Sequence, residues 1–102
     1  MFNRIDIQQA AKLIEDDALI VDIRDHNSFA QGHIQGAVRI DNSNIQEFLQ
    51  QADKSKALVV CCYHGNSSQS AAAMFDQQGF EKSYSMNGGM SEWVLTQSTV
   101  TD

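Results

Sequence analysis

The stretch that decides the fold reads Val59-Val60-Cys61-Cys62-Tyr63-His64-Gly65-Asn66-Ser67-Ser68 and continues as Gln69-Ser70-Ala71-Ala72-Ala73-Met74-Phe75. A short apolar run ends in cysteine, and a loop of small residues then leads directly into a helical pattern. In an α/β protein this order places a thiol at the carboxyl end of a strand, facing the amides of a tight loop and the positive end of a helix dipole. Such surroundings stabilise a thiolate without a cationic side chain, so the stretch predicts cysteine chemistry.

The rest of the chain alternates short apolar runs with helical patterns. We expect strands over residues 18–23, 37–40, 57–61 and 82–86. We expect helices starting after Asp6, over 25–31, 45–51 and 68–78, and after Gly88-Gly89. This alternation is typical of βαβ units, and it predicts an α/β fold with a central, mainly parallel sheet flanked by helices on both faces. Because ligands bind beyond the carboxyl ends of such strands, Asp22, Cys62 and Asn87 are expected to meet at one edge.

Several local signals mark where elements begin and end. Asp6 with Gln9 resembles a capping box at the start of the first helix, and Gly79 is expected to end the 68–78 helix. The residues after about Gln97 are polar, and we expect them to be frayed. With no proline, repeat or low-complexity linker, the chain is predicted to be one domain over residues 1–102.

Composition narrows the class of protein. Of the 102 residues, 42% are hydrophobic and 20% charged, as in a globular protein with its own core. The formal net charge of −6 argues against nucleic acid as a partner, because phosphate contacts need clustered lysine and arginine. No apolar run approaches the roughly 20 residues that span a bilayer, and the N-terminus lacks the segments of a signal peptide. The adjacent cysteines are too close for an ordinary disulfide, so we expect a reducing, cytoplasmic location. We expect no membrane partner, because the sequence has no membrane-spanning apolar run.

The loop after Cys62 separates two kinds of cysteine chemistry. Phosphoryl transfer in such a loop is associated with Cys-x5-Arg, whose arginine binds the phosphoryl oxygens in a bidentate way. Here the sixth residue after Cys62 is Ser68, and the sixth after Cys61 is Ser67, so phosphatase or arsenate reductase activity is disfavoured. Sulfur transfer remains: a thiolate attacks the outer sulfur of a donor such as thiosulfate, and inward amides hold the persulfide.

The neighbouring residues have less specific interpretations. Cys61 should point to the opposite side of the chain from Cys62 and pack in the core. His64 is either a general base or a hydrogen-bond partner within the loop, and we favour a role in specificity or simple exposure. Asp22 and Arg24 are expected to fix neighbouring loops rather than line a substrate mouth. The paired Cys-x2-Cys spacing of a structural zinc site is missing from the sequence, so we expect neither a metal nor a cofactor.

Three motifs in the chain resemble the rhodanese-like domain, and in particular its single-domain thiosulfate sulfurtransferases of the GlpE type. The residues that carry the resemblance are Cys62 to Ser68, Val21 to Asp25 with Ser28 to Ala37, and the Gly-Gly-x3-Trp element Asn87 to Trp93. The resemblance extends from about Ile5 to Trp93 and departs in one place, where Ser28 stands instead of the glutamate that is frequent in the family.

This resemblance implies a function and its residues. The implied reaction is ping-pong: thiosulfate charges the catalytic cysteine, which maps onto Cys62, and cyanide, a dithiol or thioredoxin accepts the sulfur. The substrate-binding cradle maps onto the residues that follow: Tyr63, His64, Gly65, Asn66, Ser67 and Ser68. The alternative is a non-catalytic or sulfur-carrier module that docks on a larger partner, since the loop lacks a cationic substrate site.

Overall fold

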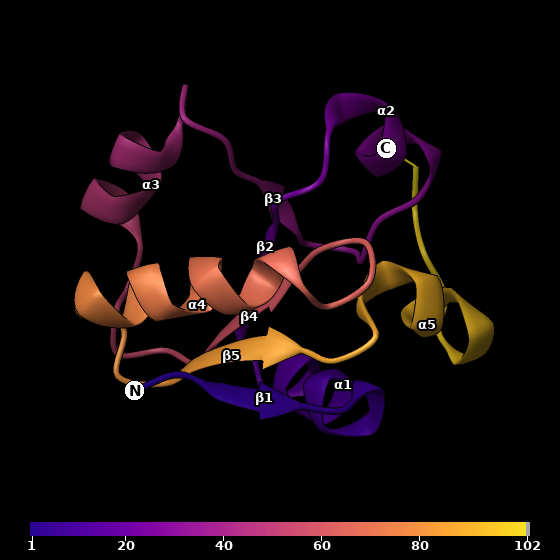
Figure 1. Cartoon of the computed structure of the whole chain (residues 1–102), viewed down its shortest axis with the longest axis horizontal. Coiled ribbons are helices and arrows are strands. Elements are labelled where there is room, and N and C mark those ends of the chain that lie inside the picture. Colours follow the sequence, from indigo (N-terminus) through magenta and orange to yellow (C-terminus); the bar gives the residue numbers. More distant parts are fainter. Residues whose placement is uncertain (102) are drawn as a thin grey trace.

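The computed structural model describes residues 1–101 and contains one sheet of five parallel strands in the order β1-β5-β4-β2-β3 (Figure 1). These strands are β1 (Asn3–Ile5), β2 (Leu19–Asp22), β3 (Val38–Arg39), β4 (Leu58–Cys61) and β5 (Ser83–Met86). Strand β4 lies at the centre, where Cys61 pairs with Asp22 of β2 and Val60 pairs with Ser85 of β5. The predicted α/β fold is confirmed, and the sheet is wholly parallel.

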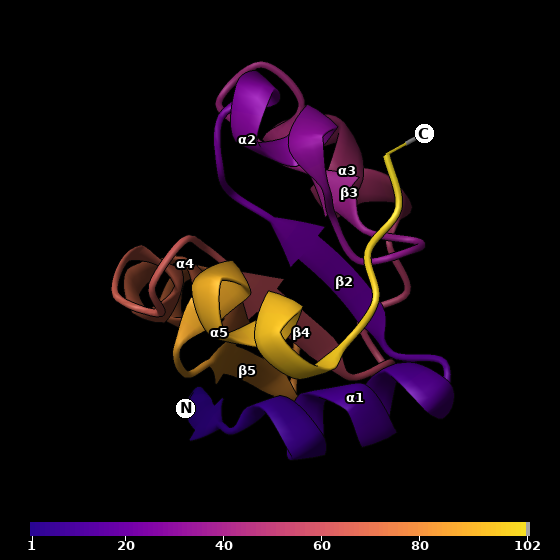
Figure 2. The same cartoon turned by 90° about the vertical axis from the view of Figure 1, so that its right-hand side faces the viewer.

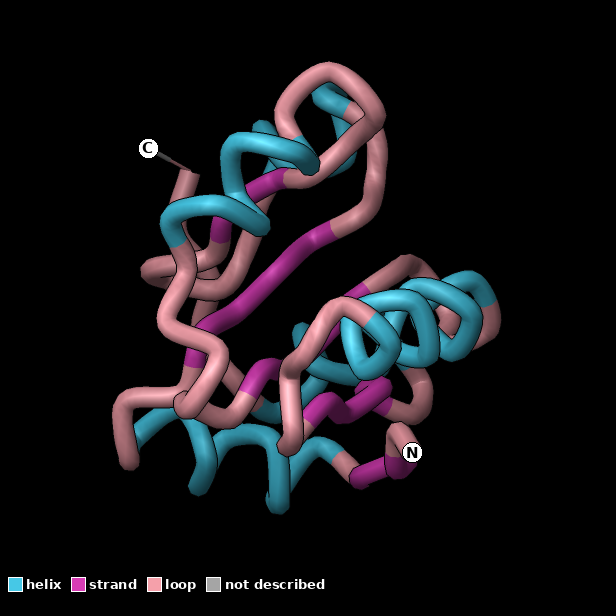
Figure 3. Tube along the Cα trace, turned by 90° about the vertical axis from the view of Figure 1, so that its left-hand side faces the viewer, coloured by secondary structure: helices cyan, strands magenta, loops and turns pink. Residues whose placement is uncertain are grey.

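Helices cover both faces of this sheet, as predicted (Figure 3). They are α1 (Ile7–Glu15), α2 (His26–Gln31), α3 (Ile45–Gln51), α4 (Ser67–Gln77) and α5 (Gly89–Thr96). One buried cluster joins Val59 to Trp93 and other residues of α1 and α5, and a second joins Val60 to Phe75 and other residues of α3 and α4. Successive residues of β4 thus enter opposite cores, as the two-residue period of a strand requires.

The predicted helix ends are confirmed. Asp6 accepts a hydrogen bond from the amide of Gln9 at 2.8 Å, and the Gln9 side chain accepts one from the Asp6 amide at 2.9 Å, which completes a capping box. After α4, the amide of Gly79 donates to Asp76 O and that of Phe80 donates to Phe75 O, at 3.1 and 3.2 Å. This bonding pattern is a Schellman motif, and it ends α4 before β5 begins.

Strand β1 was not predicted. It has three residues, of which Asn3 and Arg4 are exposed and only Ile5 is buried, so the sequence lacks the apolar run of a buried strand. Its place at the edge of the sheet explains that pattern, because one side of an edge strand has no neighbour. The other strands and helices lie where they were expected, and no predicted end differs by more than one residue.

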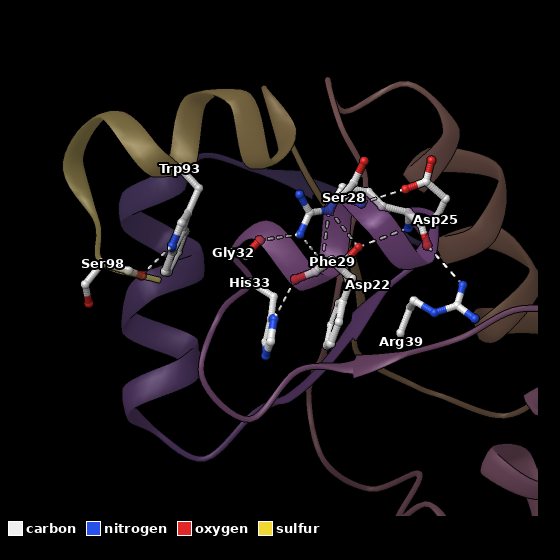
Figure 4. Close-up of polar contacts among 10 residues, drawn as sticks. Asp22, Asp25, Ser28, Phe29, Gly32, His33, Arg39, Trp93 and Ser98 are labelled. Atoms are coloured by element: carbon white, nitrogen blue, oxygen red, sulfur yellow. Dashed lines mark hydrogen bonds and ion pairs between the residues drawn. The ribbon is translucent and has the colours of Figure 1, made fainter. Parts of the chain in front are cut away.

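The segment after Gln97 differs from the frayed end that its polar sequence predicts. Val100 exchanges two backbone hydrogen bonds with His33, at 2.8 and 2.9 Å, in an antiparallel bridge. The indole Nε1 of Trp93 also donates to Ser98 O at 3.1 Å (Figure 4). Figure 2 shows this yellow segment running from α5 toward the α2 side of the molecule. The interactions are made largely by the backbone, so side-chain polarity did not indicate them.

A buried ion pair holds the end of β2. The Asp22 carboxylate accepts hydrogen bonds from Nε and Nη2 of Arg24, at 3.0 and 2.7 Å, and from the Arg24 amide at 3.0 Å. Nη2 also donates to Gly32 O at 2.8 Å, so the pair ties β2 to the end of α2 (Figure 4). The expected loop-fixing role of Asp22 and Arg24 is confirmed.

None of the helices within residues 1–101 has the length and apolar composition needed to cross a membrane.

Removal of the Asp22 carboxylate should strongly destabilise the fold. The side chains of Asp22 and Arg24 are 1% and 9% exposed, so Asp22→Ala would leave a nearly buried guanidinium without its counter-ion. We expect a loss of about 3–5 kcal/mol in the free energy of unfolding, measured by urea denaturation. Lys56→Ala, which breaks the exposed pair with Asp17, is the control and should barely move the midpoint. Equal losses in the two variants would mean that the buried Asp22–Arg24 pair contributes no more to the free energy of unfolding than an exposed pair.

Candidate active site

The central strand delivers Cys62 to the carboxyl edge of the sheet. Strand β4 ends at Cys61, and α4 begins at Ser67 after a short loop that lies beside α5 (Figure 1). The loop folds back over the sulfur of Cys62, to which the amides of Gly65 and Ser68 donate at 3.0 and 3.3 Å. Cys62 is only 5% exposed, so these amides act on the sulfur with little competition from water. The arrangement favours negative charge on sulfur.

A hydroxyl group adds to the two amides. Ser68 Oγ lies 3.3 Å from Cys62 Sγ, and Ser68 is completely buried in the first turn of α4. When the sulfur is a thiolate it has no proton to give, so the hydroxyl of Ser68 is the donor in this contact. As a thiolate, Cys62 therefore faces three donors, of which two belong to Ser68.

Helix α5 determines which way the loop peptides face. The amides of Met90 and Ser91, in the first turn of α5, donate to the carbonyls of Cys62 and Tyr63 at 2.8 and 3.0 Å. These bonds hold both carbonyls toward α5 and therefore away from the sulfur. The loop amides can then turn toward Cys62 without competition from neighbouring carbonyl oxygens.

Two glycines allow this close contact between the loop and α5. A Cβ atom on Gly89 would lie 2.5 Å from Tyr63 O and 2.6 Å from Cys62 O, closer than any side chain tolerates. Gly65 has φ +90° and would place a Cβ 2.7 Å from the amide nitrogen of Gly88. Gly89 was not among the predicted site residues. Its signal in the sequence was the Gly-Gly pair, which indicated a tight turn but not its contact with the cysteine loop.

The other predicted loop residues lie outside this sulfur cradle. Tyr63, His64, Asn66 and Ser67 are exposed, and within residues 1–101 the side-chain and amide donors bonded to the sulfur come from Gly65 and Ser68 instead. His64 Nδ1 lies 3.1 Å from Ser91 Oγ, so this histidine takes part in the contact between loop and α5. The four exposed residues form a rim around the cradle.

A pocket of about 220 Å³ adjoins this rim on the α2 side. Tyr63 forms part of its wall, whereas Cys62 is not among the lining residues, which are Arg24, Ser28, Gln31, Gly32, Tyr63, Met90, Ser91, Val94 and Thr99. Arg24 was expected to fix neighbouring loops rather than line an opening at the site. It is bonded to Asp22, as expected, but it also lines this pocket, because its guanidinium lies between Asp22 and Gly32 at the pocket wall.

Cys61 has the opposite environment from its neighbour. It is fully buried in the core formed with α1 and α5, as predicted. Burial, followed by the negative charge of Asp22, raises the pKa of the Cys61 thiol far above its usual range. Cys61 is therefore a neutral thiol near neutral pH. Within residues 1–101, no three side chains of histidine, cysteine, aspartate or glutamate gather as a metal site requires.

Comparison with known proteins agrees with this architecture. The family model described as "Rhodanese-like domain" matches residues 6–96. The chain belongs to the rhodanese-like family. It is 55% identical over 92 residues to the thiosulfate sulfurtransferase GlpE of Pseudomonas aeruginosa strain LESB58, covering 90% of this chain and 84% of that protein. It is 50% identical over 95 residues to the protein of the same name from Ectopseudomonas mendocina, covering 93% and 87%.

The fold of this rhodanese-like chain also matches solved structures. A rhodanese-related protein from Thermoplasma volcanium superposes with a TM-score of 0.83 at 23% identity, covering 98% of this chain and 99% of that one. At that level of identity the likeness concerns the fold alone.

The two cysteines of this rhodanese-like chain should differ sharply in reactivity. Because Cys61 is buried and its pKa is raised, iodoacetamide near neutral pH should label Cys62 at least about tenfold faster. Peptide mapping of the folded protein by mass spectrometry measures both rates. In urea the difference should disappear, and equal rates in the folded protein would refute the assignment of the two environments.

Substitution of Gly89 should disturb the cradle although Gly89 itself makes no contact with the sulfur in the hydrogen bonds described. Gly89→Ala forces the Cys62 and Tyr63 carbonyls away from α5, so the loop amides lose their orientation. We expect Cys62 to alkylate about tenfold more slowly, as for the loss of one hydrogen bond to a charged group. Gly36→Ala is the matched control, since Gly36 also has a positive φ, +89°, but its Cβ would meet nothing within 4 Å. A similar slowing in both variants would assign the effect to backbone strain.

Proposed function

We propose that this rhodanese-like chain is a thiosulfate sulfurtransferase that carries sulfur as a persulfide on Cys62. The observation that carries the proposal is the pair of loop amides directed at Cys62 Sγ, at 3.0 and 3.3 Å. The relatives at 55% and 50% identity that bear the name thiosulfate sulfurtransferase GlpE support the same activity.

The proposed reaction has two half-reactions. The Cys62 thiolate attacks the outer sulfur of thiosulfate, the S–S bond of thiosulfate breaks, and its electron pair leaves with sulfite. Cys62 then holds a persulfide whose negative charge equals that of the original thiolate. An acceptor attacks the outer sulfur next: cyanide leaves as thiocyanate, whereas a dithiol is oxidised to its disulfide and releases the sulfur as hydrogen sulfide. Each second step restores the thiolate of Cys62.

The loop residues divide into two roles in this proposal. Gly65 and Ser68 hold the sulfur of Cys62, while Tyr63, His64, Asn66 and Ser67 form the rim that meets the donor and acceptor. The acceptor in the cell would be a dithiol, with thioredoxin as a candidate. Both cysteines are free thiols, which suits a reducing cytoplasm.

The loop chemistry favours sulfur over phosphorus. A phosphoryl group would need the bidentate contacts of an arginine, and neither lysine nor arginine stands between Cys62 and Ser68. A persulfide carries a single negative charge on a soft atom, which peptide amides can stabilise.

Mass measurement tests the proposal directly. After incubation with thiosulfate, the intact protein should gain the mass of one sulfur atom and lose it again on treatment with cyanide. Cys62→Ser should gain nothing, and Cys61→Ser should charge like the unmodified protein because Cys61 lies in the core.

Turnover separates an enzyme from a carrier module. Repeated formation of thiocyanate from thiosulfate and cyanide supports the enzyme. Charging without turnover by either cyanide or a dithiol would favour the carrier, and absence of charging would overturn both.

A further inference from the structure

A second buried serine lies directly behind Ser68. Strand β5 pairs with β4 in a register that sets Ser85 beside Val60, close to the point where β4 ends. Ser85 is fully buried, and its Oγ lies 2.7 Å from Ser68 Oγ, which in turn lies 3.3 Å from Cys62 Sγ. Three side chains from β5, α4 and the loop therefore form a continuous row that ends on the sulfur.

The hydroxyl protons of Ser85 and Ser68 can both find acceptors only if they point toward the sulfur. Within residues 1–101, Ser68 Oγ is the hydrogen-bond partner of the Ser85 hydroxyl. If Ser85 donates to Ser68, the proton of Ser68 is free to point at the sulfur, and every hydroxyl proton has an acceptor. If the Cys62 thiol donates to Ser68 instead, the single contact between the two serines can use the proton of only one of them, and the other hydroxyl proton is left buried without an acceptor in the row. A buried unpaired donor is costly, so the first direction is favoured.

This direction suits a thiolate and not a thiol. In the favoured arrangement the sulfur accepts from the Ser68 hydroxyl in addition to the amides of Gly65 and Ser68. A thiol proton directed at Ser68 would meet the Ser68 proton, which in this arrangement already lies between the oxygen and the sulfur. The row therefore adds to the stabilisation of negative charge on Cys62, and Ser85 does so from a position that is two hydrogen bonds away.

We propose that Ser85 is a positioning residue for Cys62, which it serves by fixing Ser68 as a hydrogen-bond donor to the sulfur. The inference rests on the proposed role of Cys62 as the persulfide carrier and deepens it. The donated hydroxyl matters in both half-reactions, because Cys62 is a thiolate when it attacks the donor and again when it leaves the persulfide.

The chain offers a closely matched control for Ser85. Ser83 lies on the same strand two residues earlier, is 1% exposed, and donates its hydroxyl to Ala72 O of α4 at 2.7 Å. Ser83→Ala and Ser85→Ala thus remove the same group from the same strand at the same depth. Only Ser85 is linked to the sulfur through Ser68.

The test compares Ser83→Ala, Ser85→Ala, Ser68→Ala and the double variant Ser68→Ala/Ser85→Ala. The rate of Cys62 alkylation by iodoacetamide is measured against pH, and thermal denaturation reports the integrity of each fold. We expect Ser85→Ala to slow alkylation at neutral pH about threefold, the effect of a modest hydrogen bond, and to move the pH–rate profile toward higher pH. Ser83→Ala should leave the profile in place, and the double variant should match Ser68→Ala.

Two results would overturn the proposal. One is an equal shift of the profile in Ser83→Ala and Ser85→Ala, which would reduce Ser85 to a packing residue. The other is a full additional effect of Ser85→Ala on top of Ser68→Ala, because a residue that acts through Ser68 cannot act without it. Ser85→Cys keeps the size of the side chain and replaces the hydroxyl by a weak donor, so it gives the same comparison if the alanine variant does not fold.

The experiment keeps this inference separate from the proposed function. Alkylation requires no sulfur donor, so the row can be confirmed even if thiosulfate fails to charge Cys62, and charging can succeed while the row is refuted. The titratable side chains within two residues of Cys62 are Cys61, Tyr63 and His64, and they are unchanged in all variants, as is the buried Asp22–Arg24 pair.

Discussion

The site depends on the orientation of a few peptide groups. Two amides at the start of α5 hold the carbonyls of Cys62 and Tyr63, and this leaves the loop amides to face the sulfur. The backbone of a short loop has equal numbers of N–H donors and C=O acceptors. A neighbouring element that binds the carbonyls leaves the amides free to face the other way. In this chain that neighbour is a helix N-terminus, which has spare donors and therefore binds the acceptors.

The order of the strands explains why the sulfur meets so many groups at once. Because β4 lies between β2 and β5, the residue after β4 has a neighbouring strand on each side. The β2 side supplies the buried Asp22–Arg24 pair, which fixes the backbone near α2. The β5 side supplies Ser85 and leads into the first turn of α5. A thiol that followed an outer strand such as β1 would have had a neighbouring strand on one side only.

Much of this arrangement could be predicted from the sequence, and the limits have physical causes. Apolar runs and cap residues are local, so strands β2 to β5, the capping box at Asp6 and the burial of Cys61 were correctly predicted. Strand β1 begins with two exposed polar residues, Asn3 and Arg4, so it produces no apolar run. The roles of Gly89 and Ser85 depend on contacts between segments far apart in the chain, which no local pattern encodes. The bridge between His33 and Val100 is made by backbone groups, which carry no residue signature.

A receptor for negative charge that consists largely of main-chain amides has properties that lysine or arginine could not give it. Peptide dipoles do not titrate, and dissolved ions screen groups buried this deeply far less than they screen surface cations. Ionic strength and pH should therefore affect how charged partners approach across the rim, while the hydrogen bonds from the amides to the sulfur stay nearly constant. Side-chain replacement also leaves the backbone amides in place, so the choice of partner can be redesigned at Tyr63, His64, Asn66 and Ser67 while the sulfur chemistry persists.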